Sequence, residues 1–144
     1  MCFPIEKSVE KKWKSKTGLE CVVTRADLGR KNIIEGGYVL SHRCGYVRIP
    51  PGHPWWGTDY NDISVSVHGG ITFSEIEACE HEDGIGYWIG FDCAHAGDAT
   101  LPPDVVLLPQ FELMRPEKCE HYWTLPEVIK ETERLAKQVI SEMK

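Results

Sequence analysis

The residues best suited to chemistry are concentrated in the middle of this chain. Aliphatic and polar residues alternate over 62–68, so a strand there would present its polar side chains on one face of a sheet. A second alternating run covers 87–93, and its face opposite the aliphatic side chains carries Trp88, Gly90 and Asp92. The two runs predict a sheet face that is polar, aromatic and locally bare, and this face is the candidate site.

An imidazole beside a carboxylate is the first pairing that this face suggests. His68 and Asp92 would lie on adjacent strands, where the carboxylate could orient the imidazole as a general base. Cys93 and water are the only evident nucleophiles, and the sequence holds no hydrolase elbow, phosphate loop or dinucleotide fingerprint. A small hydrolase or transferase acting through His68, Asp92 and His95, with or without a metal, stays open as an alternative.

A metal site is the next chemistry to weigh, because Asp92, His95 and Asp98 follow one another at three-residue intervals. Two carboxylates and an imidazole can hold a divalent ion. The spacing matches no specific metal signature, however, and an aspartate after Gly97 is equally typical of a helix cap or a turn. The sequence therefore predicts neither a metal nor a cofactor.

Binding of a small phosphate-bearing ligand is a further reading of the same region. Arg43 and Arg48 are the candidate phosphate ligands, since guanidinium groups match phosphate geometry better than ammonium groups do. Gly69 and Gly70 interrupt the first alternating run, which indicates a tight turn, a bulge or a place where a ligand approaches bare backbone. An ordinary hairpin explains the same glycines.

A loop rich in proline and tryptophan could supply flat surfaces for a ligand. The three prolines of 50–57 exclude a regular helix or a central strand, so this segment predicts an ordered loop or a lid. Trp55 and Trp56 are expected to divide their roles, one anchoring the loop in the core and the other stacking on a ligand. The complete set of expected ligand-binding residues is Arg43, Arg48, His53, Trp55, Trp56, His68, Gly69, Gly70, Trp88, Asp92, His95 and Asp98.

Composition limits the classes of partner. The 144 residues, 42% of them hydrophobic, suit a single globular domain spanning 1–144 with a genuine core. A net charge of −6 makes the chain a poor candidate for binding long nucleic acid, although a small phosphate ligand needs only a few local cations. No apolar run approaches the roughly 20 residues of a membrane span, so no membrane partner and a cytoplasmic location are expected.

The six cysteines lack the C-x-x-C spacing and are expected to be reduced thiols.

The elements that must position these residues predict an α+β fold. Short connections favour a twisted, mainly antiparallel sheet of five or six strands. A long helix should begin at the capping box of Thr124 and Glu127 and run to about Glu142, with its apolar stripe packed on one face of the sheet. The same stripe would serve a homo-oligomer interface. A short N-terminal helix is predicted over 5–16, and an exposed acidic loop over 75–83.

Several sequence blocks carry a resemblance to a known family. The blocks are Cys44-Gly45-Tyr46-Val47, Pro51-Gly52-His53-Pro54, Val67-His68-Gly69-Gly70-Ile71-Thr72, the segment from Gly90 to Asp98, and the helix around 131–136. Over roughly residues 40–140 the chain resembles a family of small uncharacterised proteins encoded by phages and bacteria. The resemblance implies a compact accessory protein in a phage-type genetic context, acting in the host cytoplasm, and assigns no catalytic residue.

Two main hypotheses of function follow. The first is non-catalytic binding of a small nucleotide-like ligand, with arginines for phosphate, tryptophans for a flat ring and glycines for close approach. That the ligand is a host immune signalling nucleotide, sequestered as a counter-defence, rests on the phage resemblance alone. The second is the hydrolase or transferase described above. A protein-interaction module, with exposed tryptophans as hot spots, is the remaining class.

Overall fold

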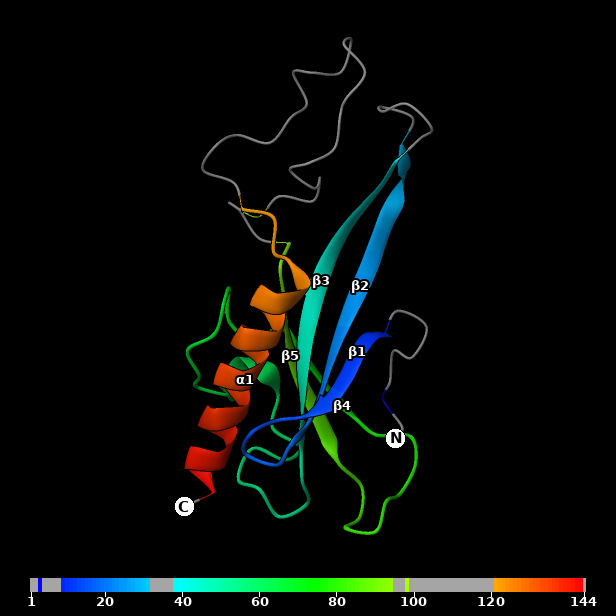
Figure 1. Cartoon of the computed structure of the whole chain (residues 1–144). Coiled ribbons are helices and arrows are strands. Elements are labelled where there is room, and N and C mark those ends of the chain that lie inside the picture. Colours follow the sequence, from blue (N-terminus) through cyan, green and yellow to red (C-terminus); the bar gives the residue numbers. More distant parts are fainter. Residues whose placement is uncertain (1–2, 4–8, 32–37, 95–97, 99–120, 144) are drawn as a thin grey trace.

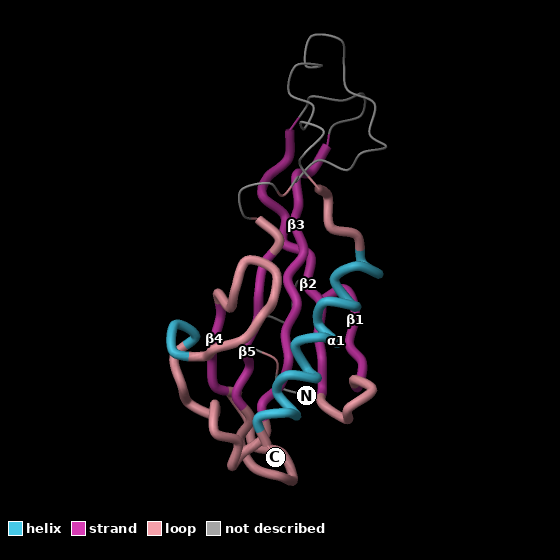
Figure 2. The backbone as a smooth tube through the Cα atoms, turned by 90° about the vertical axis from the view of Figure 1, so that its left-hand side faces the viewer, coloured by secondary structure: helices cyan, strands magenta, loops and turns pink. Residues whose placement is uncertain are grey.

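A computed structural model describes residues 3, 9–31, 38–94, 98 and 121–143. For residues 26–31 and 38–41 it describes the backbone but not the side chains. The strands are β1 (Val9–Lys14), β2 (Glu20–Lys31), β3 (Tyr38–Ile49), β4 (Phe73–Ile76) and β5 (Tyr87–Asp92), and α1 (Leu125–Glu142) is the long helix. The strands form one antiparallel sheet in the order β1-β2-β3-β5-β4. The helix lies along one face of this sheet, as predicted (Figures 1 and 2).

The main core lies between the sheet and α1. Alternate residues of β3 and β5 face the helix, and they are buried together with its apolar stripe; the members with no exposed surface are Val47, Ile49, Ile89, Val128, Leu135, Ala136 and Val139. Gly45 lies where the helix approaches β3 most closely, because a Cβ there would overlap Thr132 Oγ1 and the Phe91 ring. The close fit fixes the position of α1 on the sheet.

The opposite face of the sheet is covered by aromatic rings. Phe3, Tyr46, Phe73 and Trp88 meet edge to face, with ring centroids 4.8–5.1 Å apart. Gly90 lacks a side chain where the Tyr46 ring lies over β5, since an added Cβ would overlap that ring. The face predicted to be bare is therefore filled by the protein's own side chains around Trp88.

The predicted N-terminal helix is not found. Residues 9–14 form the edge strand β1, paired with β2, while residues 5–8 lie outside the described part of the chain. Val9 and Trp13 are four residues apart, a spacing shared by one stripe of a helix and one face of a strand. Lysines between them protect an exposed sheet edge from pairing with other chains. The charged stretch from Arg25 continues β2 to Lys31.

The strand predicted over 62–68 is also not found. A 3-10 helix, Tyr60–Asp62, precedes an extended segment that pairs with no strand. Side chains of α1 bond its backbone instead: Gln138 accepts from the Ser66 N–H at 2.8 Å and donates to the Ser66 carbonyl at 2.8 Å. The aliphatic alternation correctly predicted the buried face, since Ile63 and Val67 join the core, but alternation does not specify what the backbone bonds.

The C-terminal helix agrees with its prediction at both ends. Thr124 and Glu127 form the capping box, and Pro126 lies in the first turn. Within the described residues no helix combines the length and the apolar character that crossing a bilayer requires.

Candidate functional site

A cluster of two rings and a carboxylate forms beside the N-terminal end of α1. His68 Nε2 lies 2.8 and 2.9 Å from the two carboxylate oxygens of Asp98. The Trp123 indole N–H donates to Asp98 Oδ1 at 3.1 Å, and the Trp123 ring lies 4.3 Å from the His68 ring. The Asp98 side chain is 3% exposed and that of His68 is 24% exposed. The carboxylate thus fixes both rings from the buried side.

The backbone around His68 explains how it reaches this position. Gly69 and Gly70 both have positive φ, and the Gly70 N–H donates to the Val67 carbonyl at 2.9 Å. Such a turn needs glycine because L side chains rarely adopt positive φ. The His68 N–H donates to Glu131 Oε2 at 2.8 Å, which ties the turn to α1. The glycines therefore form a tight turn, one of the alternatives that the sequence left open.

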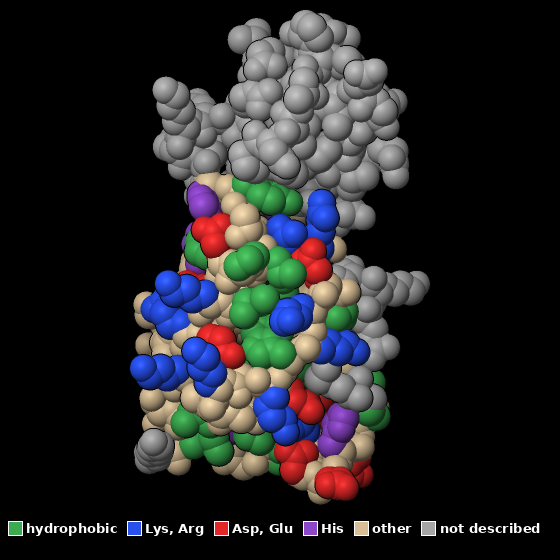
Figure 3. Space-filling model, viewed as in Figure 1, with side chains coloured by type: hydrophobic (Ala, Val, Ile, Leu, Met, Phe, Trp, Pro, Cys, Tyr) green, Lys and Arg blue, Asp and Glu red, His purple; other side chains and the backbone are tan. Residues whose placement is uncertain are grey.

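A groove continues from this cluster along α1. It has a volume of about 550 Å³ and a mostly apolar surface. Its lining residues are Lys16, Thr17, Trp123, Glu127, Lys130, Glu131, Glu133, Arg134 and Lys137. Figure 3 shows basic side chains on the helix around an apolar patch on this side of the molecule. We call this feature the Trp123 groove.

The charges of the Trp123 groove differ in how they are paired. Glu127 bonds Thr124 and His121, and Glu131 bonds Arg134 and the His68 N–H. Glu133 bonds the Trp13 indole and the Lys16 N–H. By contrast, no ion pair within the described residues involves Lys16, Lys130 or Lys137. The carboxylates are held by the protein, and the ammonium groups remain available to an anion.

Glu131 is electrostatically perturbed within the groove. The hydrogen bond from the Arg134 guanidinium is the largest effect on its pKa and lowers it below the usual 4.5; burial opposes this effect, and the hydrogen bond from the His68 N–H adds to the lowering. An ionised Glu131 therefore holds the His68 turn against α1 at neutral pH.

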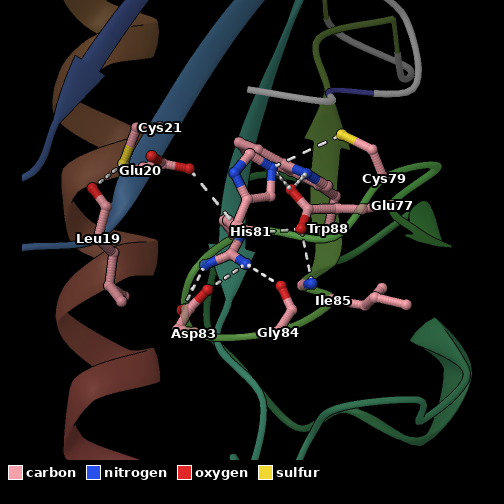
Figure 4. Close-up of polar contacts among 12 residues, drawn as sticks. Leu19, Glu20, Cys21, Glu77, Cys79, His81, Asp83, Gly84, Ile85 and Trp88 are labelled. Atoms are coloured by element: carbon pink, nitrogen blue, oxygen red, sulfur yellow. Dashed lines mark hydrogen bonds and ion pairs between the residues drawn. The ribbon is translucent and has the colours of Figure 1, made fainter.

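A second polar cluster surrounds Arg48 on the other face of the sheet. Arg48 Nε lies 3.0 Å from Glu77 Oε1, and its two terminal nitrogens lie 2.8 and 2.9 Å from the Asp83 carboxylate (Figure 4). Glu77 also accepts from the Trp88 indole at 3.0 Å and from the Gly86 N–H at 2.6 Å. Trp88 is fully buried. Glu77, predicted to lie in an exposed acidic loop, is instead 4% exposed.

The other predicted arginine is similarly engaged. Arg43 bonds both carboxylate oxygens of Glu10, at 2.7 and 3.2 Å, and its Nη1 donates to the Trp123 carbonyl at 3.0 Å. Its side chain is 12% exposed. Arg43 thus supports the segment that carries Trp123. Its guanidinium donors bond acceptors of the protein itself, Glu10 and the Trp123 carbonyl.

The proline-rich loop is ordered, as predicted. His53 is buried, with Nε2 donating to the Val139 carbonyl at 2.8 Å and Nδ1 accepting from the Trp55 N–H at 2.9 Å. Trp55 and Trp56 are both partly buried against the main core, and the Trp56 indole donates to the Ile85 carbonyl. The two indoles do not divide into one anchor and one exposed ring, because the backbone turns there rather than staying extended.

The remaining predicted residues are dispersed. Asp92 accepts from the Ala94 N–H at 3.0 Å, so the partner of His68 is Asp98 rather than Asp92. Cys93 is buried, which raises the pKa of its thiol and disfavours a nucleophilic role. His95 lies outside the described residues. No group of three potential metal ligands occurs among the residues that are described.

Among the described cysteines, Cys79 differs from the expectation. Cys21, Cys44 and Cys93 are free and buried, whereas Cys79 is disulfide-bonded. Of the predicted set, the structure brings together His68, Gly69, Gly70 and Asp98. Sequence reasoning missed the tryptophan and lysines that complete the groove. Only the exposed lysines of α1, opposite its apolar stripe, gave a signal that could have indicated them.

Comparison with known proteins adds no assignment: no protein-family model matches the chain, and neither curated proteins nor solved structures give a match. The function must therefore be argued from the geometry of this chain.

Proposed function

We propose that the chain binds a small nucleotide-like ligand in the Trp123 groove without converting it. One observation carries the proposal: a fixed, half-buried indole adjoins an apolar groove whose lysines form no ion pair with any residue that the structure describes. The volume of about 550 Å³ lies within the roughly 300–1,000 Å³ typical of small-molecule sites. Stacking of a base on an aromatic side chain contributes about 1–3 kcal/mol.

The lysines supply the complementary charge. Lys130 and Lys137 are exposed on α1, and Lys16 lies across the groove on the turn after β1. Ammonium groups bind phosphate as point charges and need no fixed fork geometry. The glutamates of the groove keep their own partners, so a phosphate would meet the lysines without having to displace a carboxylate from them. A protein that binds the nucleotide-like ligand without converting it would sequester that ligand, in line with the phage resemblance.

The His68–Asp98 pair favours one second candidate, a hydrolase or transferase. A buried carboxylate that orients an imidazole is a common arrangement for a general base. Here, however, the imidazole also packs on Trp123, and Cys93 is too deeply buried to serve as the nucleophile. Conversion of the ligand by wild-type protein would support this candidate over simple binding.

Calorimetric titration tests the proposal with adenosine diphosphate as the probe and with adenosine and ribose 5-phosphate as its two parts. Both parts should bind more weakly than the whole. Trp123→Leu and Lys130→Ala/Lys137→Ala should each weaken binding by about tenfold. The matched control is Lys11→Ala/Lys12→Ala, which removes the same charge from exposed positions on β1.

Mass analysis of the probe released by heating then separates binding from catalysis. Intact adenosine diphosphate is expected after prolonged incubation. Equal loss of affinity in the β1 control and in the helix variant would show a general charge effect and refute the groove as the site.

A further inference from the structure

A second cavity lies between the turn that joins β1 to β2 and the loop at 81–84. The same turn borders the Trp123 groove through Lys16 and Thr17, but the two cavities share no lining residue. Its volume is about 440 Å³. The charged residues that line it are Lys14, Glu20, Arg48, His81, Glu82 and Asp83. We propose that this cavity binds a small zwitterion of the amino-acid type, with an ammonium group and a carboxylate.

Glu20 provides the first step of the argument. The Glu20 side chain is 37% exposed, but its Oε2 atom is shielded from solvent and accepts no hydrogen bond from the described residues; the nearest cation among them, Arg48 Nε, is 3.9 Å away. Figure 4 shows the Glu20 side chain reaching from β2 toward the cluster around His81 and Asp83. A shielded carboxylate oxygen without a donor is rare in folded proteins. An ammonium group in the cavity would supply that donor.

Arg48 provides the carboxylate side. Its Nε is held by Glu77, whose side chain is fully buried, whereas its two terminal nitrogens are held by Asp83, whose side chain is 50% exposed. The exposed pair shows that this end of the guanidinium accepts a carboxylate in bidentate geometry. The Arg48 side chain is 9% exposed, so only the Asp83 half of this pair is open to solvent, and a ligand carboxylate could reach the same edge of the guanidinium by exchanging with that of Asp83.

Lys14 adds a second cation to the same wall. It is the direct partner of Glu20 in the β1–β2 ladder, so the two side chains share one face of the sheet. Both line the cavity, yet no ion pair joins them among the described residues. A molecule carrying both charges would pair with each.

The balance of charge excludes simpler ligands. An anion alone would face Glu20 and Glu82 and leave the shielded oxygen without a donor. A cation alone could pair with Glu20 but would leave Lys14 without an anion, since Arg48 already holds Glu77 and Asp83. Only a ligand with both groups satisfies the two sides of the cavity.

Titration of the full chain with L-alanine, propionate and ethylamine tests this inference, because the last two each lack one charge of the first. Chemical shifts of the Glu20 and Gly18 amides report binding. L-Alanine should bind saturably and at least about tenfold more tightly than either analogue. Glu20→Gln should weaken it about tenfold, whereas Glu75→Gln, an exposed carboxylate on β4, should not.

Three results would overturn the proposal. The first is the absence of a saturable chemical-shift change with L-alanine, which is expected if only water occupies the cavity. The others are propionate binding as tight as that of L-alanine, and an affinity for L-alanine that is unchanged in Glu20→Gln. If Glu20→Gln does not fold, Lys14→Met tests the other charge. This variant should also bind L-alanine more weakly than the wild type does, whereas its affinity for ethylamine should not fall. Adenosine diphosphate binding should be unchanged in either variant, since neither residue lines the Trp123 groove.

Discussion

Replacement of Glu77 by glutamine should destabilise the fold more than any other single change of a charged residue considered above. The carboxylate is fully buried and accepts from three donors: Arg48 Nε at 3.0 Å, the Gly86 N–H at 2.6 Å and the Trp88 indole at 3.0 Å. In glutamine an NH₂ group, which only donates, replaces one of the two carboxylate oxygens. At least one buried donor then faces another donor, and the Arg48 guanidinium loses its buried counter-charge and keeps only the half-exposed carboxylate of Asp83.

The expected cost is about 3–5 kcal/mol, the usual effect of breaking a buried ion pair on one side. For a chain of 144 residues, each kcal/mol lowers the melting temperature by about 2–4 °C, so the loss should be about 6–20 °C. Calorimetric unfolding of the wild type and Glu77→Gln measures it. Asp83→Asn is the matched control, because its half-exposed pair with Arg48 should contribute only about 0–1 kcal/mol.

A double-mutant cycle completes this test. Arg48→Met removes the charge that Glu77 compensates, so the double variant should lose less stability than the sum of the two single losses. Additive losses, or a Glu77→Gln variant within about 1 kcal/mol of the wild type, would refute the claim that this pair is buried and mutually dependent.

The remaining predictions concern packing, pH and thiol reactivity. Gly45→Ala and Gly90→Ala should each lower the free energy of unfolding by about 1–3 kcal/mol, because the added Cβ overlaps Thr132 or Tyr46. Chemical unfolding measures this loss. At Gly52 a Cβ would meet no atom, so Gly52→Ala tests the effect of an added methyl group without a clash, although the positive φ of Gly52 adds a cost of its own. The lowered pKa of Glu131 means that its ionised form stabilises the fold above the usual value of 4.5 and that this contribution is lost as the pH falls through the folded-state value. The stability difference between wild type and Glu131→Gln should therefore shrink on acidification, and a constant difference would contradict it. Burial raises the pKa of the Cys21 thiol to about 12, so iodoacetamide should label Cys21 only after unfolding, as followed by peptide mass analysis.

The parts of the fold that sequence predicts best are those with local physical signals. The capping box of Thr124 and Glu127, the proline at the first turn and the apolar stripe specify α1 within a few residues. The alternation over 87–93 predicts β5 and its aliphatic face, which packs in the main core, whereas the face predicted to be bare is covered by aromatic rings. These signals depend on neighbouring residues alone, so no tertiary information was needed to interpret them.

The errors arise where tertiary partners decide. Val9 and Trp13 fit a helix stripe and a strand face equally well, and pairing with β2 selects the strand. The extended segment before His68 finds its backbone partners on α1, which no local pattern records. Glu77 lies among acidic, solvent-exposed neighbours in the sequence, yet Arg48, 29 residues earlier, requires it to be buried.

The candidate site was predictable only in part. His68, the two glycines after it and Asp98 were found because their residue types stand out, but the partner of His68 was assigned to Asp92. Trp123 and the lysines of α1 were not predicted, because a lone tryptophan before a helix and lysines on its polar face carry no local signal of a binding site. Their combination becomes visible only when α1 lies against the turn after β1.

The measurement that tests the binding account most directly is the detection of nuclear Overhauser effects between adenosine diphosphate and the protein. Stacking in the Trp123 groove predicts effects between the base protons and the Trp123 indole, lost in Trp123→Leu and retained in Lys11→Ala/Lys12→Ala. The probe should remain chemically intact throughout the experiment. Effects that connect the base to Trp55 or Trp56 instead, or none at saturating probe, would contradict the account.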